Sequence, residues 1–260
     1  MQSEFYEFGG TVFRIDSEEH LLKTKFTAPF VCGARKEPDF VITVCYSDDE
    51  KMQNGFSKEH RAGSGATVAF AEKYRGKISS KNVLEEAGIF RVLAEHGGVV
   101  LHSSYVLTKQ GEAVLFSAPS GTGKSTQAEL WRKFAGARVI NGDRALIKAQ
   151  NGVTANGILF SGTSGINENV TAPLRAIVLL RQCGKNELRR VSGKEAFMRL
   201  LPQCSYYPEE EENLRLVTGI LADVISAVPI YDFGCVPEKS AYAGHFYEND
   251  SEILFVTYAK

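Results

Sequence analysis

Phe116-Ser-Ala-Pro-Ser-Gly-Thr-Gly-Lys-Ser-Thr126 is the stretch of sequence that decides the fold. It fits the Walker A pattern, with Ala118 in the first glycine position and Gly123-Lys124-Ser125 at the end. Small residues let the backbone wrap a phosphate so that several N–H groups point at the anion. An apolar strand-like run (113–116) enters this loop and a helix-like run (127–133) leaves it, which is the setting that the motif requires. The sequence therefore predicts a nucleoside triphosphate site.

Each part of the loop has an expected role. Lys124, a candidate catalytic residue, reaches the β and γ phosphates, Ser125 is placed to ligate Mg²⁺, and Thr126 backs the α phosphate. We expect ATP and Mg²⁺ to be the bound species. The expected nucleotide contacts are the consecutive residues Pro119, Ser120, Gly121, Thr122, Gly123, Lys124, Ser125 and Thr126.

A P-loop enzyme also needs a carboxylate near the metal or the nucleophile, usually at the end of a neighbouring strand. Asp143 closes Ala137-Arg-Val-Ile-Asn-Gly-Asp143, one short helix and one strand after the loop. We expect Asp143 to be a metal ligand and catalytic residue, and the alternative is an Asp in a Gly-Asp turn. The other apolar strand, 176–180, ends in Arg181 and offers no carboxylate.

His102 is the remaining candidate catalytic residue. It lies in Leu101-His-Ser-Ser104, on the strand that precedes the loop strand. A single histidine in an apolar strand is usually a core residue with satisfied hydrogen bonds, so its type and place alone leave both interpretations open.

The chain changes character near residue 80. Strand-like runs at 5–8, 11–15 and 40–46 are separated by Gly, Pro and Asp turns. Asn82 with Glu85 then resembles a capping box, and it begins an amphipathic helix that Gly97-Gly98 ends. We therefore expect two domains: a β-rich N-terminal unit over residues 1–80, suited to substrate recognition, and a catalytic P-loop domain over residues 81–260.

The rest of the second domain alternates strands and helices. Strands are expected at 99–107, 113–117, 138–141, 144–149, 157–160 and 176–182, and helices at 194–201 and 209–227. Asn151-Gly152 indicates a hairpin, and connections this short cannot carry the crossover that a parallel pair needs. The fold class expected is α/β with a mixed sheet.

Composition excludes several functions. The 260 residues are 43% hydrophobic and carry 30 basic against 31 acidic side chains, a formal charge of −1, so no excess field exists to hold nucleic acid or an anionic membrane. Five separated cysteines without a CxxC argue against a disulfide framework or structural zinc. No signal-like or spanning segment is found, and we expect a cytoplasmic protein.

These pieces together resemble the catalytic domain of HPr kinase/phosphorylase and the wider HPr-kinase-like group, whose P-loop core is related to phosphoenolpyruvate carboxykinase. The resemblance covers about residues 83 to 233, in the order Leu101-His102, Ser120 to Ser125, and Asn141-Gly-Asp-Arg144. Thr171 to Gln182 and Glu195 to Pro202 also look like HPr-kinase-like proteins. The resemblance implies that His102, the loop and Asp143 gather around the transferred phosphate.

Two departures from that family matter. The first Asp of the family's pair, its base and acid, is Gly142 here, so Asp143 alone carries over. The N-terminal half does not resemble the family's regulatory half, and the Glu-Ile-Arg-Gly-Leu-Gly segment has no counterpart. The protein HPr is therefore not the expected acceptor.

The expectation is a kinase that transfers the γ-phosphoryl group of ATP to a hydroxyl of a peptide, protein or small alcohol. A nucleotide-binding regulatory module without catalysis is the alternative, and Gly142 supports it. A carboxykinase-like enzyme is a third hypothesis, which the chain's length and lack of further metal-ligand histidines disfavour. The sequence leaves open whether the chain forms a homo-oligomer.

Overall fold

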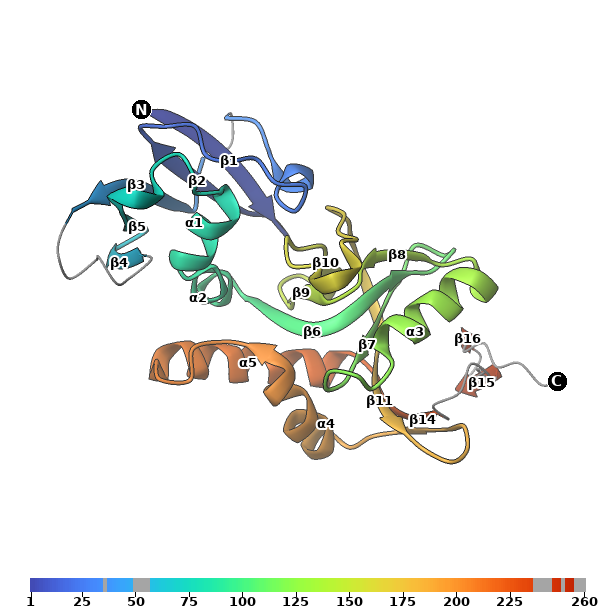
Figure 1. The fold of residues 1–260 in the computed structure, drawn as a ribbon. Coiled ribbons are helices and arrows are strands. Elements are labelled where there is room, and N and C mark those ends of the chain that lie inside the picture. Colours follow the sequence, from blue (N-terminus) through green and yellow to red (C-terminus); the bar gives the residue numbers. More distant parts are fainter. Residues whose placement is uncertain (35–36, 49–56, 236–244, 249–250, 255–260) are drawn as a thin grey trace. The chain divides into compact units, whose positions relative to one another are not determined.

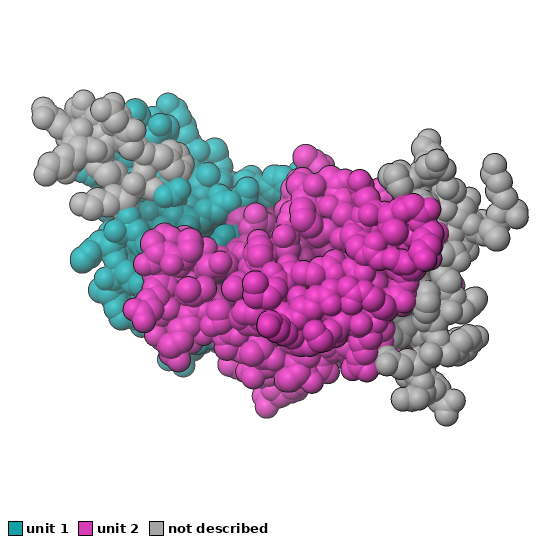
Figure 2. Space-filling model, turned by 90° about the horizontal axis from the view of Figure 1, so that it is seen from below, with its two compact units in different colours: residues 1–96 teal, residues 97–260 magenta. Residues whose placement is uncertain are grey.

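A computed structural model describes residues 1–34, 37–48, 57–235, 245–248 and 251–254. The chain forms two compact units, residues 1–96 and 97–260, coloured separately in Figure 2. The division lies later than the boundary expected near residue 80, because the helical segment after Ser79 belongs to the first unit. The C-terminal part of the expected 81–260 domain includes residues 236–244, 249–250 and 255–260, which lie outside the described residues.

The first unit contains a mixed five-stranded sheet in the order β1-β2-β3-β5-β4 (Figure 1). Its core is aromatic: Phe8 and Phe13 pack edge to face, with ring centroids 5.8 Å apart. The expected strands at 5–8, 11–15 and 40–46 are confirmed. The bounds are β1 (Gln2–Phe8), β2 (Thr11–Ser17), β3 (Phe40–Ser47), β4 (Ser57–Ala62) and β5 (Gly65–Ala71).

The helix expected from Asn82 onward is two short helices, α1 (Ser80–Glu86) and α2 (Ile89–Glu95). Ser79 is the N-cap of α1, and it exchanges capping-box hydrogen bonds with Asn82. Gly88 breaks the run because its φ of 71° is left-handed, which ends α1. The sequence pattern was right about the apolar face and wrong about the cap and the continuity.

The second unit is built on a mixed nine-stranded sheet, which agrees with the expected α/β fold class. The path β10-β9-β6-β7-β11-β14-β12 is extended by β8 and β13, which both pair with β6, and β10 also pairs with β11. The bounds are β6 (Gly98–Leu107), β7 (Ala113–Ser117), β8 (Arg138–Asn141), β9 (Arg144–Lys148), β10 (Thr154–Asn156), β11 (Thr171–Gln182), β12 (Glu187–Arg190), β13 (Cys204–Ser205) and β14 (Ile230–Cys235), with a separate hairpin of β15 (His245–Glu248) and β16 (Ser251–Leu254).

Parallel and antiparallel pairs meet in this sheet. β7, β11 and β14 are mutually parallel neighbours, whereas β6 is antiparallel to β7, β8 and β9. The hairpin signal is confirmed between β9 and β10, where Asn151 and Gly152 have φ of 57° and 98°. The strand expected at 157–160 is wrong: the chain pairs at 154–156 and then leaves the ladder.

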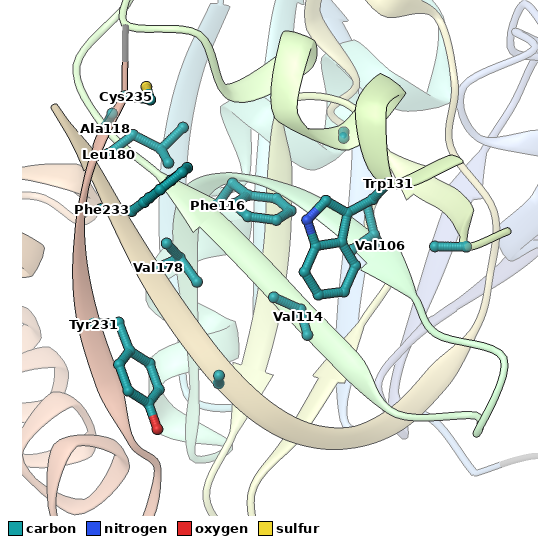
Figure 3. Packing of buried hydrophobic residues seen from close by; sticks show 13 residues of the cluster. Val106, Val114, Phe116, Ala118, Trp131, Val178, Leu180, Tyr231, Phe233 and Cys235 are labelled. Atoms are coloured by element: carbon teal, nitrogen blue, oxygen red, sulfur yellow. The ribbon is translucent and has the colours of Figure 1, made fainter. Parts of the chain in front are cut away.

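Helices cover both faces of the parallel strands. On one face α3 (Lys124–Leu130) and the π-helical turn Trp131–Ala135 pack on β7, where Trp131 meets Phe116 edge to face at 5.5 Å (Figure 3). Side chains alternate along β14, so Asp232 points to the other face, where α4 (Gly193–Leu200) supplies its partner Arg199. The last helix, α5 (Glu211–Ala227), packs against α4.

A buried charge cluster ties α4 to the sheet. Asp232 is fully buried and accepts from Arg199 Nη1 at 2.6 Å and Arg181 Nε at 2.8 Å, with Arg189 Nε at 3.4 Å. Burial raises the pKa of Asp232, but the Arg181 and Arg199 guanidiniums outweigh burial and hold that pKa below its usual range. The carboxylate is therefore charged at neutral pH, which stabilises the junction.

We expect Asp232→Asn to destabilise the protein by about 2–3 kcal/mol at pH 7, because the guanidiniums lose their buried counter-charge. Because the folded pKa is depressed, the wild type holds this stabilisation above the unfolded pKa of about 4 and loses it as pH falls through the folded pKa. Urea unfolding at pH 7 and pH 3 measures both effects, with the exposed Asp223→Asn on α5 as control. Equal stability of Asp232→Asn and the control at pH 7 would contradict this account.

Candidate functional site

The Gly-rich loop, residues Ala118–Gly123, joins the end of β7 to the start of α3. Gly121 and Gly123 have φ of 79° and 113°, a left-handed backbone that favours glycine. A Cβ built on either would meet nothing within 4 Å, so the space beside the loop is not filled by side chains. The sequence placed the loop correctly between strand and helix, and its backbone leaves room for an anion.

Lys124 begins α3 and folds back under this loop. Its side chain is buried, and Nζ donates to the carbonyl oxygens of Ala118 at 2.8 Å and Pro119 at 3.3 Å. Burial lowers the pKa of Lys124, and the charge of Asp143 offsets part of that effect. A desolvated ammonium bonded only to neutral carbonyls gains strongly from an approaching anion.

Asp143 lies at a bend rather than at the end of a strand. The pairing with β6 keeps one register from Asn141 opposite Tyr105 to Arg144 opposite His102, so β8 continues into β9 through the bend. Asn141 makes the bend: its Oδ1 accepts the backbone N–H groups of residues 143 and 144 at 2.9 and 3.0 Å. The turn interpretation of Asp143 is therefore right about the backbone, while its carboxylate lies in a cavity lined with charged and polar groups.

β6 brings Asp143 to the Gly-rich loop. Ser103 pairs with Ser117, the last residue of β7, and its N–H also donates to Asp143 O at 2.9 Å. Because β6 is antiparallel to both β7 and β8, these two strands run in the same direction on either side of it. Their carboxyl ends therefore lie at the same edge of the sheet. The expected common edge is correct, but the two strands are not direct neighbours.

His102 and Arg144 both approach the Asp143 carboxylate. His102 Nε2 is 3.5 Å from Oδ1, and Arg144 Nε is 3.4 Å from Oδ2. The hydrogen bond from His102 and the charges of His102 and Arg144 hold the pKa of Asp143 below its usual range, although burial opposes this. His102 is therefore not an isolated core histidine but part of an acid–imidazole pair.

Gln203 and Ser205, which no sequence pattern predicted, contact His102 and Arg144 respectively. Gln203 Oε1 lies 3.3 Å from His102 Nδ1, and Ser205 Oγ accepts from Arg144 Nη1 at 2.8 Å. Both come from the segment around the two-residue strand β13, which pairs with β6 about one hundred positions away in sequence. A two-residue strand leaves no periodic signal, so no sequence pattern could have found them.

A cavity of about 300 Å³ brings these groups together. The Gly-rich loop and α3 form part of its wall, the bend after β8 another, and the segment Ser161–Ser164, also missed from sequence, a third. Among the residues described, none of those lining it is aliphatic or aromatic; they are His102, Ser120, Gly121, Gly123, Lys124, Ser125, Thr126, Gly142, Asp143, Ser161, Thr163 and Ser164. Pro119 and Thr122, also expected as nucleotide contacts, do not line it.

A larger cavity, of about 440 Å³, lies elsewhere on the same unit. Its lining includes Trp131, Phe134, Glu112 and Arg175. Arg175 Nε lies 3.9 Å from Glu112 Oε2. The described residues that line this larger cavity offer charged groups but no histidine–carboxylate pair beside a Gly-rich loop, so the chemistry of the lining rather than its size selects the smaller cavity as the candidate site.

Asp143 is the one carboxylate among the described residues that line the candidate site, and Ser125 is one of several hydroxyl groups there. Across the described ranges, no group of three or more His, Cys, Asp and Glu side chains gathers into a metal site. A hydroxyl and a carboxylate beside an open loop fit Mg²⁺, which takes one or two protein ligands and completes its shell with phosphate oxygens and water. They do not fit a zinc site.

Gly142 cannot simply be replaced by the aspartate that the family resemblance implies. A Cβ at this position would lie 2.3 Å from Ser164 Oγ and 2.5 Å from Ser164 Cβ. Rotation of the serine would not relieve a clash with its Cβ, so the backbone itself would have to move. The place of the second carboxylate is occupied by Ser164.

Comparisons with known proteins give little beyond this geometry. No family model matches the chain, and no curated protein matches it. A solved structure of the HPr(Ser) kinase/phosphatase from Coxiella burnetii is similar at 12% identity and a TM-score of 0.30, over 52% of this chain and 85% of that chain. That likeness is too weak to carry an argument. Separately, none of the helices in the described part of the chain has the length and apolar character needed to cross a membrane.

We expect Gly142→Ala to destabilise the second unit by about 1–3 kcal/mol through its clash with Ser164. Ser164→Gly should remove the obstacle, so the double variant should be more stable than the sum of the two single changes predicts, by about 1 kcal/mol or more. A double-mutant cycle by thermal denaturation measures this coupling. Strict additivity would show that Ser164 does not fill the position of a side chain at 142.

Proposed function

We propose that the second unit is an ATP- and Mg²⁺-dependent kinase that transfers the γ-phosphoryl group to a hydroxyl of a peptide, a protein or a small alcohol. One observation carries the proposal: Lys124 and Ser125 line the same polar cavity as the His102–Asp143 pair. Phosphoryl transfer needs cations for the phosphates and an oriented acceptor at one point in space.

The loop side of the cavity suits the triphosphate. Lys124 would exchange its two carbonyl partners for the β and γ oxygens, where its charge offsets charge that grows in the transition state. The backbone N–H groups of the loop and the hydroxyls of Ser125 and Thr126 would take the remaining oxygens. Mg²⁺, held by Ser125 and Asp143, would supply further neutralisation of the phosphates.

The other side suits the acceptor. Asp143 is held ionised by His102 and Arg144, so it can accept a hydrogen bond from the acceptor hydroxyl and orient its oxygen. In the transfer the acceptor oxygen bonds to the γ-phosphorus as the bond from that phosphorus to the β–γ bridging oxygen breaks, ADP leaves, and the hydroxyl proton passes to Asp143, which His102 orients. Because the transition state is loose, positioning counts for more than base strength, so one carboxylate suffices.

The proposal extends to the rest of the chain in outline. The β-rich first unit would contribute to acceptor recognition, and the near-neutral charge of the whole chain suits neither nucleic acid nor a membrane as partner. A cytoplasmic location is proposed because the five cysteines stand far apart in the sequence without a CxxC pair.

A nucleotide-binding module without catalysis is the second candidate. The specific observation in its favour is the filled space at Gly142, which removes the second carboxylate by packing and not only by sequence. Such a module would bind ATP through the same loop and transfer nothing.

Transfer by the wild type separates these two candidates, and Asp143→Asn tests the role of the carboxylate. We expect it to keep ATP affinity within about threefold while cutting transfer by about 10² or more, because it loses electrostatic and orienting help at the acceptor. Lys124→Ala should instead lose most of the ATP affinity as well. Calorimetry with Mg·ATP and ³²P transfer to mixed hydroxyl acceptors measure both quantities.

The exposed Asp223→Asn on α5 is the matched control, and both quantities should stay at wild-type values. ATP binding without transfer in the wild type would support the inactive module. Wild-type turnover by Lys124→Ala would remove the nucleotide assignment altogether.

A further inference from the structure

Ser161 lines the candidate site, and its buried hydroxyl has no role in the mechanism described above. Its side chain is 2% exposed, and its Oγ has no hydrogen-bond partner among the described residues. Its carbonyl oxygen accepts from Ser164 Oγ at 2.6 Å, which fixes the backbone of the short 3₁₀ turn Gly162–Ser164. An unpaired buried hydroxyl costs stability, so its presence in a cavity wall calls for a ligand that pairs with it.

The turn that carries Ser161 is built against the Asp143 carboxylate. Gly162 has a φ of 52°, and a Cβ there would lie 2.8 Å from Asp143 Cγ. Glycine is therefore required both by the backbone angle and by the close approach. The segment that carries Ser161 therefore packs directly against the carboxylate proposed to orient the acceptor.

The charge and polarity of the wall restrict the acceptor. Lys124 and the loop lie at the triphosphate end, and beyond them the lining offers His102, Asp143 and the hydroxyls of Ser161, Thr163 and Ser164. Among the described residues that line this end there is no lysine or arginine to hold a second anion, and Asp143 would repel one. Apart from the His102 ring, the described part of this lining offers no apolar side chain to receive the residues that flank a peptide serine.

We propose that Ser161, with Thr163 and Ser164, forms the acceptor subsite and that the acceptor is a small, neutral, polyhydroxylated molecule. The inference rests on the proposed kinase function and narrows its acceptor. One hydroxyl of such a molecule takes the phosphoryl group beside Asp143, while a second pairs with Ser161 Oγ. The cavity of about 300 Å³, shared with the phosphates, has room for a molecule the size of a triol or a single sugar ring.

The test uses the full chain with [γ-³²P]ATP and four probes: glycerol, D-glucose, myo-inositol and a seryl decapeptide. We expect phosphorylation of at least one polyol and not of the peptide. Ser161→Ala should raise the KM for that polyol about tenfold or more while the KM for ATP stays unchanged, because the substrate hydroxyl loses its partner.

Thermal denaturation supplies a second, independent readout. Ser161→Ala should raise Tm by about 2 °C or more, since it removes an unpaired buried hydroxyl. Ser80→Ala is the matched control: Ser80 is equally buried in the first unit but donates to Thr27 Oγ1 at 3.1 Å. That control should lower Tm rather than raise it, because it loses a made hydrogen bond, and should leave the KM for ATP unchanged.

The outcomes separate this inference from the function it rests on. Transfer to the peptide alone would overturn the polyol class and leave the kinase proposal standing. Transfer to a polyol with an unchanged KM in Ser161→Ala would overturn the subsite. Calorimetric binding of Mg·ATP with transfer to no probe, together with a Tm lowered by Ser161→Ala, would contradict both.

Discussion

Three consecutive residues of β6, His102 to Ser104, hold the two halves of the candidate site together. The carbonyl oxygen of His102 accepts from Ser117 Oγ at 2.9 Å, where the Gly-rich loop leaves β7. On the other edge of β6, Ser103 N donates to Asp143 O at 2.9 Å and Ser104 Oγ to Gly142 O at 3.1 Å. The loop and the carboxylate therefore cannot separate unless β6 itself loses its pairing, and the side chain of His102 lies at the junction.

The site retains groups that a purely stable core would not contain. Lys124 is a buried cation paired with neutral carbonyls, and Ser161 is a buried hydroxyl whose Oγ has no partner in the described chain. Burying each group without a full partner lowers the stability of the folded protein. A ligand that supplies the missing charge or hydrogen bond would offset this cost. By contrast, the buried carboxylate of Asp232 forms ion pairs with Arg181 and Arg199, and these pairs join α4 to the sheet. The difference between these two environments is the physical argument that the cavity binds a ligand.

Local signals in the sequence predicted much of the fold. The strands at 113–117 and 138–141 and the Asn151-Gly152 hairpin depend on neighbouring residues, and they agree with the structure. Long-range pairing was out of reach: the approach of Gln203 to His102 depends on a two-residue strand, and the segment Ser161–Ser164 shows no periodicity. The packing around Gly142 was equally out of reach. The sequence shows only that a carboxylate is missing there, whereas the structure shows that Ser164 lies where a Cβ at this position would be. Family membership and the roles of the site residues remain predictions.

The account depends on one claim, that the cavity between the Gly-rich loop and Asp143 receives the γ-phosphate of ATP. A crystal structure of the full chain with Mg²⁺ and the non-hydrolysable analogue AMP-PNP tests this claim most directly. We expect the triphosphate along the loop, Lys124 Nζ turned from Ala118 O to the β and γ oxygens, and the γ-phosphate on the side of the cavity that Asp143 lines. A nucleotide bound in the cavity beside Trp131, or one whose γ-phosphate points away from Asp143, would contradict it.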